Sequence, residues 1–68
     1  MIEIKITSEY ITLGQFLKFS GIITNGCEAK EFIEKNNILV DGNVEKRRGR
    51  KLYKNTIIKI ENIDYKII

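Results

Sequence analysis

The chain has no histidine and a single cysteine, Cys27, among its 68 residues. Histidine is the commonest general base and metal ligand in proteins, so its absence removes the usual starting point for catalysis and for metal binding. One cysteine cannot form an internal disulfide, and without a partner ligand it cannot build a zinc site of the usual kind. We expect Cys27 to be a small, semi-buried side chain near a helix start; a reactive thiol is the less favoured alternative.

Long apolar runs are missing as well. No segment approaches the roughly 20 consecutive apolar residues that a membrane-spanning helix needs. The first six residues alternate between apolar and polar side chains and lack the apolar core of a secretory signal. We therefore expect a cytoplasmic protein without a membrane partner.

The short length sets a further limit. The chain makes one domain, residues 1–68, and a domain of this size buries only about 60% of the surface that its unfolded form exposes. It has no room for a large enclosed substrate pocket beside its core. Glu28, Glu31 and Glu34 are expected on a solvated helix face, and no stretch matches the phosphate-binding loop GxxxxGK[ST]. We expect no catalysis, no cofactor and no metal site.

What the chain does contain is a concentrated cationic segment, residues 46–54. It carries six basic side chains and no acidic one, whereas the rest of the chain holds six basic and nine acidic side chains. All three arginines, Arg47, Arg48 and Arg50, fall within it. Arginine makes bidentate contacts with phosphates, and such a cluster on a compact domain is typical of a nucleic-acid binder. A solvated loop is the alternative; in either case we expect a connection whose arginines are dispensable for folding.

Two short helices are expected before this segment. Thr12 and Gln15 have the spacing of a capping box, and Gly21 is placed to end the helix, which predicts a helix at about residues 13–20.

The second helix should begin at Asn25, a good capping residue, with Glu28 completing a weaker capping box. It should end before residues 36–37. The two helices are short, so we expect them to pack against each other through a shared apolar surface: Phe16, Leu17, Phe32 and Ile33.

Strands are expected in the rest of the chain. Asp41 and Gly42 form a strong two-residue hairpin signal. Leu52 and Tyr53 should anchor the cationic segment to the core, with stacking of Tyr53 on a base as the less favoured alternative. Alternation and apolar runs predict strands at residues 2–7, 38–40, 43–45, 56–60 and 63–68.

A binding surface is expected where the second helix starts. Free N–H groups and the helix dipole favour anions there, and Lys30 lies one turn inside the helix. If the hairpin brings residues 46–51 alongside, the two parts form one anion-binding surface. The candidate contact residues are Asn25, Gly26, Lys30, Lys46, Arg47, Arg48, Arg50 and Lys51.

The order of these parts resembles the S4 RNA-binding domain over about residues 12–60. The matching positions are Leu13, Leu17, Gly21, Asn25-Gly26, Ala29 and Val40-Asp41-Gly42. Segments 11–18 and 47–53 are similar to the small stand-alone YaaA-like members of that family in Gram-positive bacteria. The resemblance implies an α+β fold in which two short helices pack against a small, mainly antiparallel sheet, the alpha-L motif. It also implies RNA as ligand, contacted by the second helix and the following hairpin.

The chain departs from the family pattern at two places. Thr12-Leu13-Gly14 stands where Arg-Leu-Asp is usual, and Asn25-Gly26 stands where Ser-Arg is usual. The Arg47–Lys51 cluster can replace the missing charge, which would move the docking surface toward the hairpin. We therefore expect a monomeric, non-catalytic module for structured RNA, ribosomal or transfer RNA. A protein-interaction module for an acidic partner and a DNA-binding module linked to replication remain alternatives.

Overall fold

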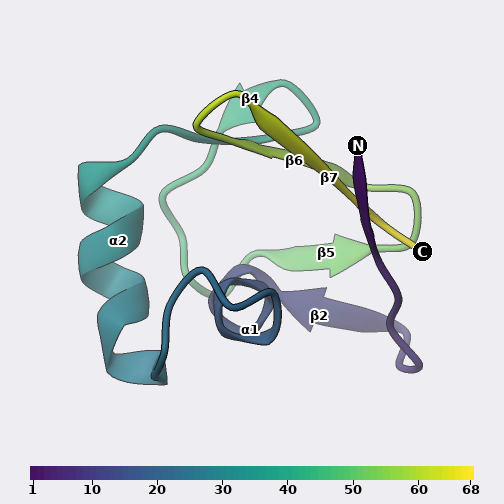
Figure 1. The fold of residues 1–68 in the computed structure, drawn as a ribbon, viewed down its shortest axis with the longest axis horizontal. Coiled ribbons are helices and arrows are strands. Elements are labelled where there is room, and N and C mark those ends of the chain that lie inside the picture. The colour runs from purple at the N-terminus through teal and green to yellow at the C-terminus, as the bar shows by residue number, and fades with distance from the viewer.

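Two sheets and two helices make up the computed structural model, which describes residues 1–68 (Figure 1). The helices are α1 (Leu13–Phe19) and α2 (Ala29–Lys35), and a 3₁₀ turn, η1 (Gly26–Glu28), precedes α2. The strands are β1 (Ile2–Ile4), β2 (Tyr10–Thr12), β3 (Ile38–Val40), β4 (Asn43–Val44), β5 (Lys51–Tyr53), β6 (Ile57–Ile60) and β7 (Ile63–Ile67). The expected α+β class, with two short helices and a mainly antiparallel sheet, is confirmed.

The larger sheet has five strands in the order β1-β7-β6-β3-β4. Its neighbours are antiparallel except for β1 and β7, which run parallel. The β3–β4 hairpin turns at Asp41 and Gly42, both with positive φ (49° and 87°), and the β6–β7 hairpin turns at Glu61 and Asn62 in the same way (51° and 66°). Such turns match the twist of the strands they join, and the predicted hairpin at Asp41-Gly42 is confirmed.

A second sheet, a ribbon of β2 and β5, was not expected. The expected strands do not include residues 10–12, yet Tyr10 begins β2 and pairs with Tyr53 of β5. The three-residue strand is too short to show a period in the sequence, and its last residue, Thr12, also caps α1. The ribbon lies beside α1 and apart from the larger sheet (Figure 1).

The start of α1 agrees with the sequence. Gln15 donates its backbone N–H to Thr12 Oγ1 at 3.3 Å, and Thr12 donates its own to Gln15 Oε1 at 3.0 Å, which completes the capping box. Gly21 follows the helix with a φ of 81°, a conformation that glycine adopts without strain. The predicted helix is confirmed, one residue shorter than expected.

The start of α2 differs in detail. Asn25 Oδ1 accepts the backbone N–H of Cys27 at 3.1 Å, so it caps η1 rather than α2. The expected capping box with Glu28 does not form, because the Glu28 carboxylate accepts a hydrogen bond from the Thr24 hydroxyl instead. Cys27 is exposed, so the expectation of a semi-buried thiol was wrong.

The core consists of fifteen buried apolar residues drawn from both sheets and both helices. Phe16 of α1 packs edge-on against Tyr65 of β7, with ring centroids 5.4 Å apart, which joins the helix to the larger sheet. Leu52 is fully buried as expected, but Tyr53 is 45% exposed and does not anchor the core. Phe32 is only partly buried, so its expected role in the surface shared by the helices is reduced. No helix has the length and apolar character to cross a membrane.

Candidate nucleic-acid interface

Backbone hydrogen bonds hold the cationic segment in place, in addition to the anchoring that was expected from Leu52 and Tyr53. Leu13 donates its N–H to the carbonyl of Arg50 at 2.8 Å, and Gly14 donates to the carbonyl of Arg48 at 3.0 Å. Residues 51–53 then pair with β2. These bonds hold the segment against the first turn of α1, so its side chains project from a defined backbone.

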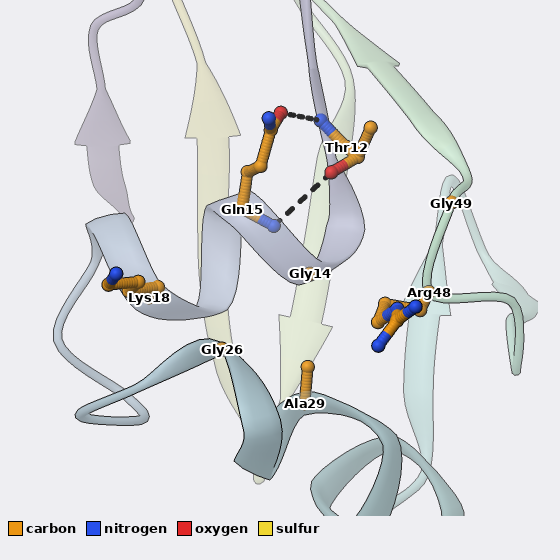
Figure 2. A pocket seen from close by; sticks show the side chains of 8 residues that line it. All are labelled: Thr12, Gly14, Gln15, Lys18, Gly26, Ala29, Arg48 and Gly49. Carbon is orange, nitrogen blue, oxygen red and sulfur yellow. Dashed lines mark hydrogen bonds between the residues drawn. The ribbon is translucent and has the colours of Figure 1, made fainter.

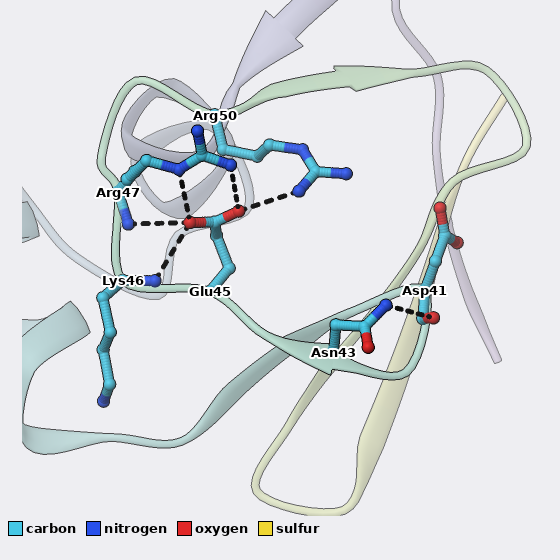
Figure 3. A network of polar contacts seen from close by, with 6 residues as sticks. All are labelled: Asp41, Asn43, Glu45, Lys46, Arg47 and Arg50. Atoms are coloured by element: carbon cyan, nitrogen blue, oxygen red, sulfur yellow. Dashed lines mark hydrogen bonds and ion pairs between the residues drawn. The ribbon is translucent and has the colours of Figure 1, made fainter.

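A buried carboxylate, Glu45, lies directly before the segment (Figure 3). Glu45 is 6% exposed, and it is the one charged residue that is buried. Its Oε2 accepts the backbone N–H groups of Lys46 (3.1 Å) and Arg47 (3.0 Å) and the Nε–H of Arg47 (3.0 Å). Its Oε1 accepts Arg47 Nη2 at 3.1 Å and Arg50 Nη1 at 2.8 Å. Every acceptor position of this carboxylate therefore faces a donor.

These donors lower the pKa of Glu45 to about 2. The hydrogen bond from the Arg47 side chain is the largest cause, and it outweighs burial, which by itself raises the pKa of a carboxyl. The Arg47 backbone N–H and the Arg50 side chain lower the pKa further. Glu45 is therefore ionised in the folded protein at neutral pH.

Glu45 divides the arginines into two groups. Arg47 and Arg50 pair with it, with 74% and 36% of their side chains exposed, respectively. Arg48 has no ion pair with any carboxylate. The arginines lie in a connection, as expected. Because the buried charge of Glu45 is paired with Arg47 and Arg50, we now expect these two side chains to contribute to stability.

Lys46 also has partners within the protein. Its ammonium donates to the carbonyls of Ile33 and Asn36, each at 3.1 Å. These carbonyls belong to the last turn of α2 and to the residue after it, where a positive charge complements the helix dipole. Figure 3 shows the Lys46 side chain pointing away from Glu45. Lys46 thus ties the cationic segment to α2.

Arg48 borders a hollow of about 270 Å³ between the starts of the two helices (Figure 2). Its side chain extends toward Ala29, while Lys18 lies at the other end of the hollow. Both charged residues that line it are basic, and no acidic residue does. The lining consists of Thr12, Gly14, Gln15, Lys18, Gly26, Ala29, Arg48 and Gly49.

Gly14 allows Arg48 to take this place. A Cβ atom at position 14 would lie 2.7 Å from Arg48 Cγ and 3.3 Å from Arg48 Cδ, which is too close. A residue with a side chain, such as the aspartate that the S4 pattern usually has here, would have to displace the Arg48 side chain. The departure at position 14 and the cationic segment are physically linked.

The other predicted contact residues are distributed unevenly around this hollow. Gly26 lines it, so Arg48 and Gly49 do lie beside the start of the second helical region. Asn25 uses its side-chain oxygen for capping. Lys30 is exposed on α2 but does not line the hollow. Sequence reasoning missed Lys18, and its position four residues after Gly14, one helical turn further on, is the signal that could have indicated it.

A second hollow, of about 570 Å³, lies on the other side of the segment. Its lining consists of Asp41, Arg47, Gly49, Arg50, Lys51, Tyr53 and Thr56. No cluster of three or more His, Cys, Asp or Glu side chains that could hold a metal ion is present.

The comparisons with known proteins agree with the fold. A family model described as the S4 domain matches residues 4–68. A protein described as a probable ribosome maturation protein RlbA, from Bacillus subtilis (strain 168), is 47% identical over 58 residues, which cover 85% of this chain and 82% of the relative. The match includes the last strand, β7, and begins at the final residue of β1, Ile4, so it extends on both sides beyond the region of residues 12–60 on which the resemblance was based.

Proposed function

The chain belongs to the S4 domain family, and from this premise we propose that it is a non-catalytic RNA-binding module in a ribosome-related process. The family resemblance implies RNA as ligand, and the Bacillus subtilis relative carries a name that refers to ribosome maturation. The ligand that we propose is structured RNA, ribosomal RNA before transfer RNA. The protein would act in the cytoplasm as a monomer.

The observation that carries the proposal is the hollow between the two helix starts. Arg48 and Lys18 border it without a neighbouring carboxylate. The guanidinium of Arg48 forms no ion pair within the protein, so its donors are free for phosphate oxygens. Because its backbone is bonded to Gly14, less conformational freedom is lost when it binds.

The remaining predicted contacts would contribute less to affinity. Arg47 and Arg50 already share their charge with Glu45, and Lys46 already bonds to the end of α2. We propose that they strengthen the positive potential around Arg48 and orient the backbone of the RNA. Lys30 and Lys51 would add outer contacts, and Asn25 and Gly26 would form the floor beside Ala29.

A salt titration tests the proposal. Labelled hairpin RNA is titrated with the protein at several salt concentrations, and about three phosphate contacts should give a log–log slope of about −2 to −3. Arg48→Ala should reduce the slope by about one, and it should weaken binding to unrelated RNA sequences by similar factors. Lys59→Ala is the matched control, because Lys59 is an exposed lysine of β6 outside both hollows.

The same titration separates the alternatives. An affinity that hardly changes between low and moderate salt would contradict a phosphate contact and favour a protein partner. Duplex DNA that competes as well as hairpin RNA would redirect the proposal to DNA.

A further inference from the structure

Two tyrosines lie side by side on the outer face of the β2–β5 ribbon. Tyr10 and Tyr53 are directly paired across the strands, with ring centroids 5.8 Å apart and the ring planes tilted by 53°. They are 37% and 45% exposed, whereas their neighbours in the same strands, Ile11 and Leu52, are buried. The ribbon therefore presents an apolar inner face to the core and an aromatic outer face to solvent.

Positive charge surrounds this aromatic pair. The Lys51 ammonium lies 4.9 Å from the centroid of the Tyr10 ring, a cation–π contact. Tyr53 lines the second hollow together with Arg47, Arg50 and Lys51. The one acidic residue of that lining, Asp41, already accepts the backbone N–H of Ile57 at 2.9 Å. Lys51 has no carboxylate partner, so its charge is available at the rim.

Glu45 prepares the arginine side of this hollow. From the Arg50 guanidinium, Glu45 accepts a hydrogen bond only from Nη1. The other guanidinium nitrogens of Arg50 therefore have no acceptor within the protein. A guanidinium that is held by a buried carboxylate is already oriented before a ligand arrives. The hollow thus combines an exposed ring, an oriented guanidinium and an ammonium that has no carboxylate partner.

The two hollows meet at Gly49, which lines both of them. A Cβ atom at this position would meet nothing within 4 Å, so the surface at Gly49 is open. One nucleic-acid strand can therefore pass over Gly49 from the Arg48 side to Tyr53.

The geometry points to a site for one unpaired RNA nucleotide, whose base stacks on Tyr53 and whose phosphate contacts Arg50 and Lys51. This inference rests on the proposed function and adds to it a preference for RNA with an unpaired nucleotide beside a paired stem. Unpaired bases stack on aromatic side chains, and adjacent basic side chains bind their backbone. A wholly paired stem hides its base faces, so it would use only the Arg48 side.

The test compares two labelled RNAs that differ only in one bulged nucleotide. The wild type should bind the bulged RNA more tightly than the fully paired one. Tyr53→Ala should weaken the affinity for the bulged RNA by about tenfold, the range expected for loss of one stacked base. The affinity for the fully paired RNA should not change. Tyr53→Phe keeps the ring and should keep the preference. Tyr53→Ile keeps the strand propensity without the ring, and it replaces Tyr53→Ala if the alanine variant does not give a cooperative thermal transition.

A fluorescent base gives a second readout. With 2-aminopurine as the bulged nucleotide, stacking should quench its emission when the wild type binds and not when Tyr53→Ala binds. Equal binding of both RNAs by the wild type, or unchanged quenching by Tyr53→Ala, would overturn the inference. So would an acidic, aromatic peptide that displaces the bulged RNA from the wild type but not from Tyr53→Ala, because the surface would then serve a protein. In each case the salt slope with the paired RNA and its reduction by Arg48→Ala report separately on the proposed function.

Discussion

The two sides of the cationic segment use the same residue type for different purposes. On one side Arg47 and Arg50 pair with the buried Glu45, which is 6% exposed. On the other side Arg48 borders an acid-free hollow between the helices and pairs with no carboxylate. A cluster of arginines in a sequence therefore does not measure the charge available for a ligand, because an adjacent acid can take up part of it.

The largest difference between the two sides should appear when Glu45 is neutralised. Glu45→Gln replaces an acceptor oxygen by an amide that faces the arginine donors, and it should lower the free energy of unfolding by about 1–3 kcal/mol. For a domain of this size each 1 kcal/mol shifts the Tm by about 4–8 °C. Thermal unfolding followed by circular dichroism measures the change.

Glu31→Gln is the matched control for this substitution. Glu31 pairs with Lys35 at 2.7 Å on the surface of α2, with about 70% of each side chain exposed. Exposed pairs of this kind contribute little, so the Tm should change only slightly. Equal effects of the two substitutions would mean that the Glu45 network does not support the fold.

The next largest difference is expected between alanine substitutions of the arginines on the two sides. Arg47→Ala leaves Glu45 short of its main donor and should cost about 1–2 kcal/mol of stability, while its effect on RNA affinity is secondary. Arg48→Ala should change stability by less than about 0.5 kcal/mol and weaken RNA binding by about tenfold. Urea unfolding and RNA titration of both variants check the pair. The comparison fails if Arg48→Ala destabilises the protein as much as Arg47→Ala does.

Low pH should remove the contribution of the Glu45 carboxylate to stability without a mutation. The pKa of Glu45 is lowered from 4.5 to about 2 in the folded protein. A lowered pKa means that the folded state holds its proton less tightly than the unfolded state, so the stabilisation is present above pH 4.5 and is lost as the pH falls from 4.5 toward 2. The Tm difference between the wild type and Glu45→Gln should therefore shrink over this range. A difference that stays constant would show that the charge of Glu45 is not what stabilises the segment.

The smallest effect is expected at Gly14, where the two sides are joined to α1. Gly14→Ala improves helix propensity by about 0.5–1 kcal/mol, yet its Cβ would displace the aliphatic chain of Arg48. Stability should change little, and RNA affinity should fall by less than with Arg48→Ala. Parallel measurement of Tm and affinity tests this, and an unchanged affinity would show that the position of Arg48 is not set by Gly14.

Much of the fold could be predicted from local patterns. The capping box of Thr12 and Gln15 and the turn at Asp41-Gly42 each depend on residues within about four positions, and both form as expected. The buried faces of β6 and β7 follow from alternation, because a strand has a period of two. The candidate site was harder to predict. The sequence located the cationic segment, but it did not indicate that Arg47 and Arg50 pair with Glu45 while Arg48 does not.

The sequence by itself determined the two helices, the strands of the larger sheet, the hairpin at Asp41-Gly42 and the concentration of charge, since these depend on near neighbours and on composition. The tertiary structure alone decided which side chains meet. Pairing of β2 with β5 brings Tyr10 to Tyr53 and turns Leu52 inward, and this register directs Lys51 and Tyr53 outward. The buried Glu45 then forms ion pairs with Arg47 and Arg50, whereas Arg48 has no carboxylate partner. Contacts between distant segments depend on how strands pair and on which charge loses its water, and neither leaves a periodic signal in the chain.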